Sequence, residues 1–150
     1  MPPKNWGPPI WYLIHGLTYN IKSEKVEDIH NLFRICALII SSLPCPKCSL
    51  DGMNIMKSVN IRNIKTKDDI IYIMFCVHNK VNNKLSKPQF KFDDFNTLYC
   101  RLNITKCIHQ YKDIMTSRQM RAGNINHNWN MNKCIAKFME YIILNKNLFL

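Results

Sequence analysis

Apolar residues recur every three or four positions along most of the chain, which is the spacing of helices that bury one face. The strongest stripe consists of Ile29, Leu32, Phe33, Cys36, Ile40 and Leu43, and Ile35, Leu38 and Ile39 fill the other side of the same segment. A helix that is apolar nearly all round is a central one. We expect Ser23 to cap this helix and Pro44 to end it.

The N-terminal segment carries aromatic side chains on one helix face. Trp6–Trp11 is expected to open a helix, because proline suits a first helical turn. Trp11, His15 and Tyr19 follow one another at intervals of four, so they share a face. Spacing alone favours an aromatic core stripe with a hydrogen-bonded histidine over a ligand site.

A second helix with polar groups on a buried face is expected over residues 70–85. Thr66 and Asp69 form a capping box ahead of it. His78 and Asn82 interrupt a face that is otherwise apolar. Buried imidazole and amide groups need hydrogen-bond partners, and either the protein or a polar ligand must supply them.

The remaining segments have weaker helical patterns. We expect helices over residues 46–59, 93–101 and 106–121, and an Asn-rich linker over 123–130. A last amphipathic helix is marked by Met131, Ile135, Phe138 and Ile142. Its apolar face must pack on the body or on a second subunit, and the pattern does not decide which. No alternating strand pattern and no repeat occurs, so the predicted fold class is all-α, most simply a helical bundle.

Composition narrows the choice of function. The 150 residues are 47% hydrophobic, enough for one domain with a core. Four glycines exclude a Gly-rich phosphate loop. The net charge of +11 is spread along the chain, which indicates a solvated basic surface and no specific nucleic-acid partner. We see no signal peptide and no apolar run that could span a membrane, so we expect a cytoplasmic protein.

Seven cysteines, an odd number, argue against the disulfide scaffold of a small secreted domain. Cys45 and Cys48 form a Cys-x-x-Cys at the expected start of the helix over 46–59. Unpaired N–H groups and the helix dipole favour a thiolate there, and Lys47 adds positive charge. The two sulfur atoms are close enough in sequence for a reversible disulfide.

Three chemistries could use this Cys-x-x-Cys. A zinc site would need Cys76 and His78 as its other half, but only one residue separates them and they lie in the middle of a helix. A thioredoxin-like site would need a preceding strand. A redox cofactor fits better, because aromatic rings can sandwich a flat ring system, while Lys84, Lys87 and His78 can pair with phosphates. A flavin passes electrons from a dithiol to oxygen.

Three segments carry a family resemblance, in order and at matching spacing. They are Trp11-x-x-x-His15, Pro44-Cys45-Pro46-Lys47-Cys48, and His78-Asn79-Lys80-Val81-Asn82-Asn83-Lys84-Leu85-Ser86-Lys87-Pro88, with Phe90 also fitting. Together they resemble the Erv/ALR family of FAD-dependent sulfhydryl oxidases, over roughly Trp6 to Tyr99. The compact form and the Leu43-Pro44-Cys45 variant are most similar to members encoded by large cytoplasmic DNA viruses.

The resemblance implies a four-helix bundle holding FAD, with a short fifth helix, over residues 1–100, and a helical extension of unknown role over 101–150. It implies that Cys48 lies against the isoalloxazine ring and forms the charge-transfer thiolate. Cys45 is then the outer sulfur that an incoming thiolate attacks. The implied FAD-binding residues are Trp6, Gly7, Trp11, His15, Tyr19, His78, Asn79, Val81, Asn82, Lys84, Lys87 and Tyr99.

The chain departs from the family pattern at two places. Tyr99 stands where the family usually has a tryptophan that stacks on FAD. Phe75 and Phe92 stand at the two positions of a structural disulfide found in cellular members, so we expect a hydrophobic contact instead. Cys76 and Cys36 are then expected to be buried free thiols.

The implied activity is oxidation of protein dithiols through the Cys45–Cys48 pair, with electrons passing through FAD to O2 and hydrogen peroxide as product. The resemblance further implies viral disulfide formation in the host cytoplasm, association with the virion, and a homodimer. Cys100, Cys107 and Cys134 are the candidates for a shuttle pair, with unpaired or structural thiols as the alternative. The rival function is a non-catalytic basic helical interaction protein with a structural zinc or Cys-pair site. No metal is expected in the favoured function.

Overall fold

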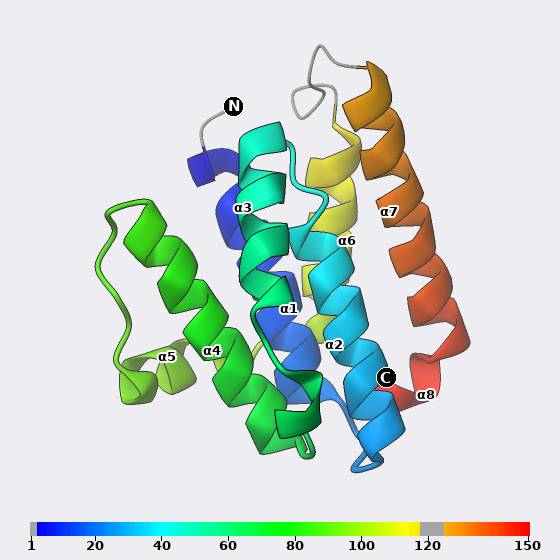
Figure 1. The fold of residues 1–150 in the computed structure, drawn as a ribbon. Helices are drawn as coiled ribbons and strands as arrows, with labels where there is room; N and C mark the ends of the chain where they lie inside the picture. The colour runs from blue at the N-terminus through cyan, green and yellow to red at the C-terminus, as the bar shows by residue number, and fades with distance from the viewer. Residues whose placement is uncertain (1–2, 118–124) are drawn as a thin grey trace.

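The computed structural model describes residues 3–117 and 125–150, and no strand occurs within these ranges (Figure 1). The longer helices are α1 (Pro3–Asn20), α2 (Val26–Ile40), α3 (Pro46–Lys57), α4 (Lys67–Lys84), α6 (Ile104–Thr116) and α7 (Ile125–Leu144). The short ones are η1 (Ile61–Asn63), α5 (Phe92–Tyr99) and α8 (Lys146–Phe149). The predicted all-α fold, with a bundle, a short fifth helix and C-terminal helices, is confirmed.

Helices α1 and α2 lie at the centre of the molecule. Leu13, Ile14 and Leu17 of α1 and Ile29 and Leu32 of α2 are fully buried. In Figure 1, α4 and α5 lie on one side of this pair, and α6 and α7 lie on the other. None of the described helices combines the length and the hydropathy that a membrane span requires.

The C-terminal extension packs on the body of the same chain. Helix α6 contacts α1 and helix α7 contacts α2. Their buried residues belong to the same apolar cluster as those of α1 and α2; they are Ile104, Cys107, Ile108, Tyr111, Met115, Met131, Ile135, Phe138 and Ile142. The apolar face of the last predicted helix therefore has its partner within the chain.

Two predicted N-terminal boundaries are wrong. Helix α1 begins at Pro3, with Pro8 and Pro9 inside it, rather than opening at Trp6. Helix α2 begins at Val26 with Lys25 as its N-cap, so Ser23 does not cap it. The Ser23 hydroxyl instead donates to Asp28 at 2.5 Å and accepts from the Lys25 N–H at 3.2 Å, so its backbone partner is the residue just before the helix.

Two further helix ends show how local and tertiary effects compete. The predicted capping box is confirmed, because the Asp69 N–H donates to Thr66 Oγ1 (3.1 Å) and the Thr66 N–H donates to Asp69 Oδ2 (3.0 Å). The linker predicted over 123–130 is wrong from Ile125 onward, where α7 begins. Residues 123 and 124 of that linker lie outside the described ranges. So do residues 118–121, the end of the helix predicted before it. Asparagine is a weak helix former, but a hydrogen bond from His127 Nε2 to the Leu43 carbonyl (2.7 Å) ties this end to the body.

Candidate active site

The Cys-x-x-Cys lies at the first turn of α3, as predicted. Cys45 is the N-cap, Pro46 is the first helical residue, and the two cysteines form a disulfide. The Cys48 N–H donates to Cys45 Sγ at 3.2 Å. This sulfur therefore occupies the position that a capping oxygen takes in other helices, where positive charge from the helix end favours a thiolate.

The loop before Cys45 is fixed by a single hydroxyl. Ser49 Oγ accepts from the Leu43 N–H at 2.8 Å. It lies 3.0 Å from the Leu43 carbonyl and 3.2 Å from the Cys45 carbonyl, and it can donate to either.

Helix α3 also lies close to α2. A Cβ added at Gly52 would stand 2.5 Å from Ile40 Cγ2 and 2.7 Å from the Ile40 carbonyl oxygen. Glycine at this position thus allows the approach that sets the place of the disulfide.

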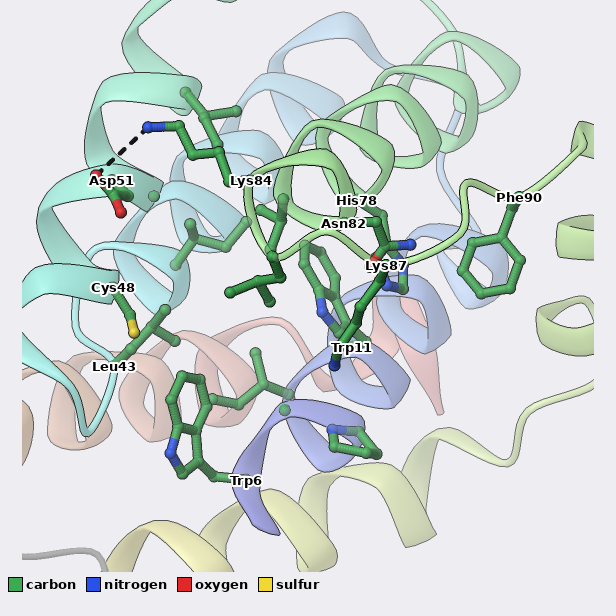
Figure 2. A pocket seen from close by; sticks show the side chains of 18 of the residues that line it. Trp6, Trp11, Leu43, Cys48, Asp51, His78, Asn82, Lys84, Lys87 and Phe90 are labelled. Carbon is green, nitrogen blue, oxygen red and sulfur yellow. Dashed lines mark hydrogen bonds and ion pairs between the residues drawn. The ribbon is translucent and has the colours of Figure 1, made fainter. Parts of the chain in front are cut away.

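A pocket of about 390 Å³ opens between α1, α3, α4 and the segment that follows α4. Figure 2 shows Cys48 at one end, and His78, Asn82 and Lys87 grouped with Trp11 at a distance from it. Cys48 lines this pocket, whereas Cys45 is not among its lining residues. Nine of the predicted cofactor-binding residues line it: Trp6, Gly7, Trp11, His78, Val81, Asn82, Lys84, Lys87 and Tyr99.

Stacked rings form the wall of the pocket near α4. The Trp11 and His78 rings are nearly parallel, with centroids 3.9 Å apart. Behind them, His15 Nε2 lies 2.9 Å from His78 Nδ1. Burial lowers the pKa of His78 to about 3, with a further contribution from Lys87, and burial together with His78 lowers the pKa of His15 well below its ordinary value. Both imidazoles are therefore neutral at neutral pH, and the wall carries no charge of its own.

Three of the predicted FAD-binding residues lie outside the lining of the pocket. His15 is fully buried behind His78. The Tyr19 hydroxyl donates to Asn96 Oδ1 of α5 at 2.7 Å. Asn79 holds the segment after α4, because its side chain accepts from the Phe90 N–H (2.8 Å) and donates to the Phe90 carbonyl (3.0 Å). His15 and Asn79 thus bond residues that line the pocket, whereas Tyr19 bonds α5.

The end of α4 directs the next segment towards the pocket. Ser86 has a φ of 55°, in the left-handed region. The Lys87 N–H donates to the Asn82 carbonyl (2.8 Å) and the Ser86 N–H to the Asn83 carbonyl (3.2 Å). This is the pair of bonds of a Schellman motif. The turn brings Lys87 and Pro88 into the lining.

Sequence reasoning missed one whole wall of the pocket. Asp51, Gly52 and Ile55 of α3 line it together with Cys48. Positions three, four and seven after a helical residue lie on its own face, so the spacing from Cys48 could have identified them. Lys84, which was predicted, lies 3.4 Å from Asp51 and joins α4 to α3 in an exposed ion pair (Figure 2).

The lining suits a flat aromatic ligand with polar substituents. The Trp6 Nε1 atom is buried without a hydrogen-bond partner among the described residues. Asn82 is only 7% exposed, and no described residue bonds its side-chain amide. A Cβ added at Gly7 would meet no atom within 4 Å. A bound ligand could pair with the Trp6 N–H and the Asn82 amide, and with the cation of Lys87 this set of groups fits FAD.

The two departures from the family pattern are resolved in part. Phe75 and Phe92 are in edge-to-face contact with ring centroids 5.2 Å apart, so the predicted hydrophobic contact is confirmed. Cys36 is a buried free thiol, as predicted, and burial raises its pKa to about 12. Cys76 is free but only half-buried, so that prediction was wrong on burial. Tyr99 is buried and lines the pocket.

The remaining cysteines differ in exposure. Cys107 and Cys134 are buried, and burial raises the pKa of both thiols, whereas Cys100 is exposed. A buried thiol with a raised pKa is a poor nucleophile, so Cys100 is the shuttle candidate that an incoming disulfide can reach. Within the described ranges no three His, Cys, Asp or Glu side chains gather where they could hold a metal ion.

Comparisons with known proteins agree with this geometry. A sequence model of the Erv1/Alr family matches residues 8–101. The chain is 30% identical over 99 residues to the probable FAD-linked sulfhydryl oxidase OPG072 of vaccinia virus (strain Copenhagen), which covers 62% of this chain and 93% of that protein. No solved structure matches.

Two other viral proteins are similar at lower identity. The FAD-linked sulfhydryl oxidase of African swine fever virus (isolate Warthog/Namibia/Wart80/1980) is 27% identical over 100 residues, 63% of this chain and 80% of that protein. The putative FAD-linked sulfhydryl oxidase 088R of frog virus 3 is 28% identical over 97 residues, 57% of this chain and 60% of that protein. Since the family match covers more than half of the chain and includes the disulfide and most of the pocket lining, this protein belongs to the Erv1/Alr family.

Proposed function

We propose that this protein is an FAD-linked sulfhydryl oxidase that converts protein dithiols to disulfides. The observation that carries the proposal is the placement of the disulfide, with Cys48 on a pocket that fits FAD and Cys45 outside its lining. The names of the viral relatives support it. When bound, FAD supplies a two-electron acceptor for a dithiol and reduces O2 to hydrogen peroxide.

The chain's own residues carry out thiol–disulfide exchange. A substrate thiolate attacks Cys45 Sγ, so that a substrate–Cys45 disulfide forms, the Cys45–Cys48 bond breaks, and Cys48 leaves as a thiolate. The second substrate thiol loses its proton and attacks the mixed disulfide, which releases Cys45 and the oxidised substrate. The Cys48 N–H, 3.2 Å from Cys45 Sγ, stabilises Cys45 as the leaving thiolate. Two electrons then reside on the reduced pair.

The polar residues of the pocket would hold the cofactor. Trp6 and Asn82 offer unpartnered hydrogen-bonding groups, Trp11 and Tyr99 offer aromatic surface, and Lys87 offers a cation for phosphate. The neutral His78 ring stacks on Trp11 and keeps that wall uncharged. The mainly apolar lining of the pocket limits the entry of water to the bound cofactor.

Spectroscopy and oxygen uptake test this function together. The purified protein is expected to be yellow, with the absorbance of bound flavin, and to consume O2 with dithiothreitol while releasing hydrogen peroxide. Cys48→Ser should abolish O2 consumption, whereas Cys76→Ser, a half-buried free thiol outside the pocket lining, should retain it. A colourless protein that contains zinc would instead support a non-catalytic interaction protein.

The setting of the activity is also part of the proposal. Because the relatives named above are viral, we place this protein in the cytoplasm of an infected host, acting on viral structural proteins, and associated with the virion. The homodimer implied by the family resemblance stays a prediction, which light scattering of the purified chain would test. Substitution of the exposed Cys100 by serine would test for a shuttle, since only turnover of a protein substrate should fall.

A further inference from the structure

A second, smaller hollow of about 240 Å³ lies against the start of α3, away from the FAD pocket. We call it the α3–α7 groove. It is lined by Ser41, Ser42, Pro46, Ser49, Leu50, Met53, His127, Asn130 and Met131. At about 100° per residue, Pro46, Leu50 and Met53 lie on the face of α3 opposite to the one that bears Cys48. The two hollows therefore flank the disulfide helix on opposite sides.

The groove is too small for a cofactor and well matched to a side chain. Small-molecule sites in proteins measure about 300–1,000 Å³. Leu50, Met53 and Met131 provide apolar surface, and Ser41 and Asn130 provide polar atoms at the same hollow. Leu50 is 53% exposed, so apolar surface is open to solvent. This lining suits one apolar side chain carried on an extended segment, whose backbone amides meet the polar groups.

Hydrogen bonds join the groove to the loop that carries Cys45. The hydroxyl oxygen of Ser49, a lining residue, is 3.2 Å from the Cys45 carbonyl oxygen. His127, a lining residue of α7, donates to the Leu43 carbonyl at 2.7 Å. Both walls of the groove are thus tied to the two residues on either side of Pro44. Pro46, which follows Cys45 directly, lines the groove, so a segment seated there lies against the residue next to the outer cysteine.

We propose that the α3–α7 groove binds the cysteine-bearing segment of the protein substrate, by seating an apolar side chain next to the reacting cysteine. This rests on the proposed function. Because Cys48 opens on the FAD pocket and Cys45 is outside its lining, the incoming thiolate must reach Cys45 from a side that this pocket does not occupy. The groove is on the opposite face of α3 from that pocket and is lined by Pro46, the residue after Cys45. His127, Asn130 and Met131 follow the family match, which ends at residue 101. The C-terminal extension is therefore a substrate-selecting element of this chain.

Competition between two peptide substrates and a small thiol tests the proposal. The probes are a synthetic peptide dithiol with leucine next to its first cysteine, the same peptide with glycine in place of leucine, and dithiothreitol. Burial of a leucine side chain should raise kcat/KM for the leucine peptide about tenfold over the glycine peptide. Leu50→Glu, which places a charge in the groove, should bring the two peptides to equal kcat/KM.

A second variant and a control keep the result decisive. Asn130→Trp fills the groove from α7 and should remove the same preference, even if Leu50→Glu does not fold. Leu144→Glu changes an exposed leucine at the other end of α7 and should keep the full preference. The proposal that the groove binds substrate would be wrong if the unchanged protein had equal kcat/KM for the two peptides. It would also be wrong if Asn130→Trp kept the preference for the leucine peptide. Failure to oxidise dithiothreitol would contradict the oxidase function instead.

Discussion

His15 Nε2 and His78 Nδ1 lie 2.9 Å apart inside the bundle, at the wall between the core and the FAD pocket. One imidazole must donate and the other accept, and two neutral rings in complementary tautomers meet this requirement. His15 is fully buried and His78 is 5% exposed. A proton added to either ring would bring a charge into an apolar wall, and one added to the accepting nitrogen would also break the shared hydrogen bond.

This arrangement predicts acid sensitivity. The pKa of His78 falls from an ordinary 6.5 to about 3 on folding, chiefly through burial. Between these values the unfolded chain binds a proton that the folded chain excludes, so the free energy of unfolding should fall as the pH falls from 6.5 towards 3, by up to about 1.4 kcal/mol per pH unit. Above pH 6.5 this ring should contribute no slope. His78→Phe should flatten the slope measured by urea unfolding, whereas the exposed His109→Gln should leave it unchanged.

The turn after α4 makes a prediction about stability. Ser86 has a φ of 55°, which costs a residue with a Cβ about 1 kcal/mol and glycine almost nothing. Ser86→Gly should therefore raise the free energy of unfolding by up to about 1 kcal/mol, less the extra entropy of glycine in the unfolded chain. Ser86→Ala retains the Cβ and should show no gain. Denaturant melts of the three proteins give the comparison, and equal gains for glycine and alanine would refute the backbone argument.

Two glycines at the pocket should respond differently to alanine. A methyl group at Gly52 would collide with the backbone of α2, so Gly52→Ala should cost about 1–3 kcal/mol and move the disulfide helix. At Gly7 it meets no protein atom, and alanine improves the helix by up to about 1 kcal/mol. Gly7→Ala should thus preserve stability and lower flavin affinity if the cofactor packs there. Thermal melts with and without FAD separate the effects.

The extension should be part of the folding unit. Phe138 of α7 is fully buried and contacts Tyr111 of α6, with ring centroids 5.2 Å apart. Phe138→Ala should lower the free energy of unfolding by about 3–5 kcal/mol. Ile143→Ala, on the exposed side of the same helix, should change it by less than about 0.5 kcal/mol. A small effect of Phe138→Ala would mean that residues 101–150 fold apart from the body.

Local patterns predicted those parts of the fold that local physics controls. The apolar stripe of α2 and the Thr66–Asp69 capping box depend on neighbours within one or two turns, and both are present. Residues 125–130 were predicted as a linker because asparagine is a weak helix former, yet they form the first turns of α7, where His127 bonds the distant Leu43 carbonyl. Ser23 is not the N-cap because α2 begins only at Val26, and its hydroxyl bonds the Lys25 N–H and Asp28 instead.

The pocket residues that belong to a sequence motif were predicted, and those that reach the pocket only through helix packing were missed. His78 and Asn82 were singled out as polar groups on a buried face, and both line the pocket. Ile40 of α2 also lines it, close to α3 at Gly52, where a Cβ would collide with Ile40. That approach is a tertiary distance, which a single sequence does not contain.

A substitution at Asn82 should separate an effect on cofactor binding from an effect on folding stability. Asn82 lines the pocket, and no hydrogen bond of its side-chain amide occurs within the described residues, so a bound ligand can take that amide as its partner. Asn82→Leu should leave the apoprotein about as stable, because no hydrogen bond within the described protein is lost. The same change should weaken FAD binding about tenfold, since a hydrogen bond worth about 1.4 kcal/mol is lost. Asn83→Leu, an exposed neighbour outside the pocket lining, should alter neither quantity. Flavin titration and apoprotein melts would measure both, and unchanged FAD affinity in Asn82→Leu would remove this amide from the cofactor site.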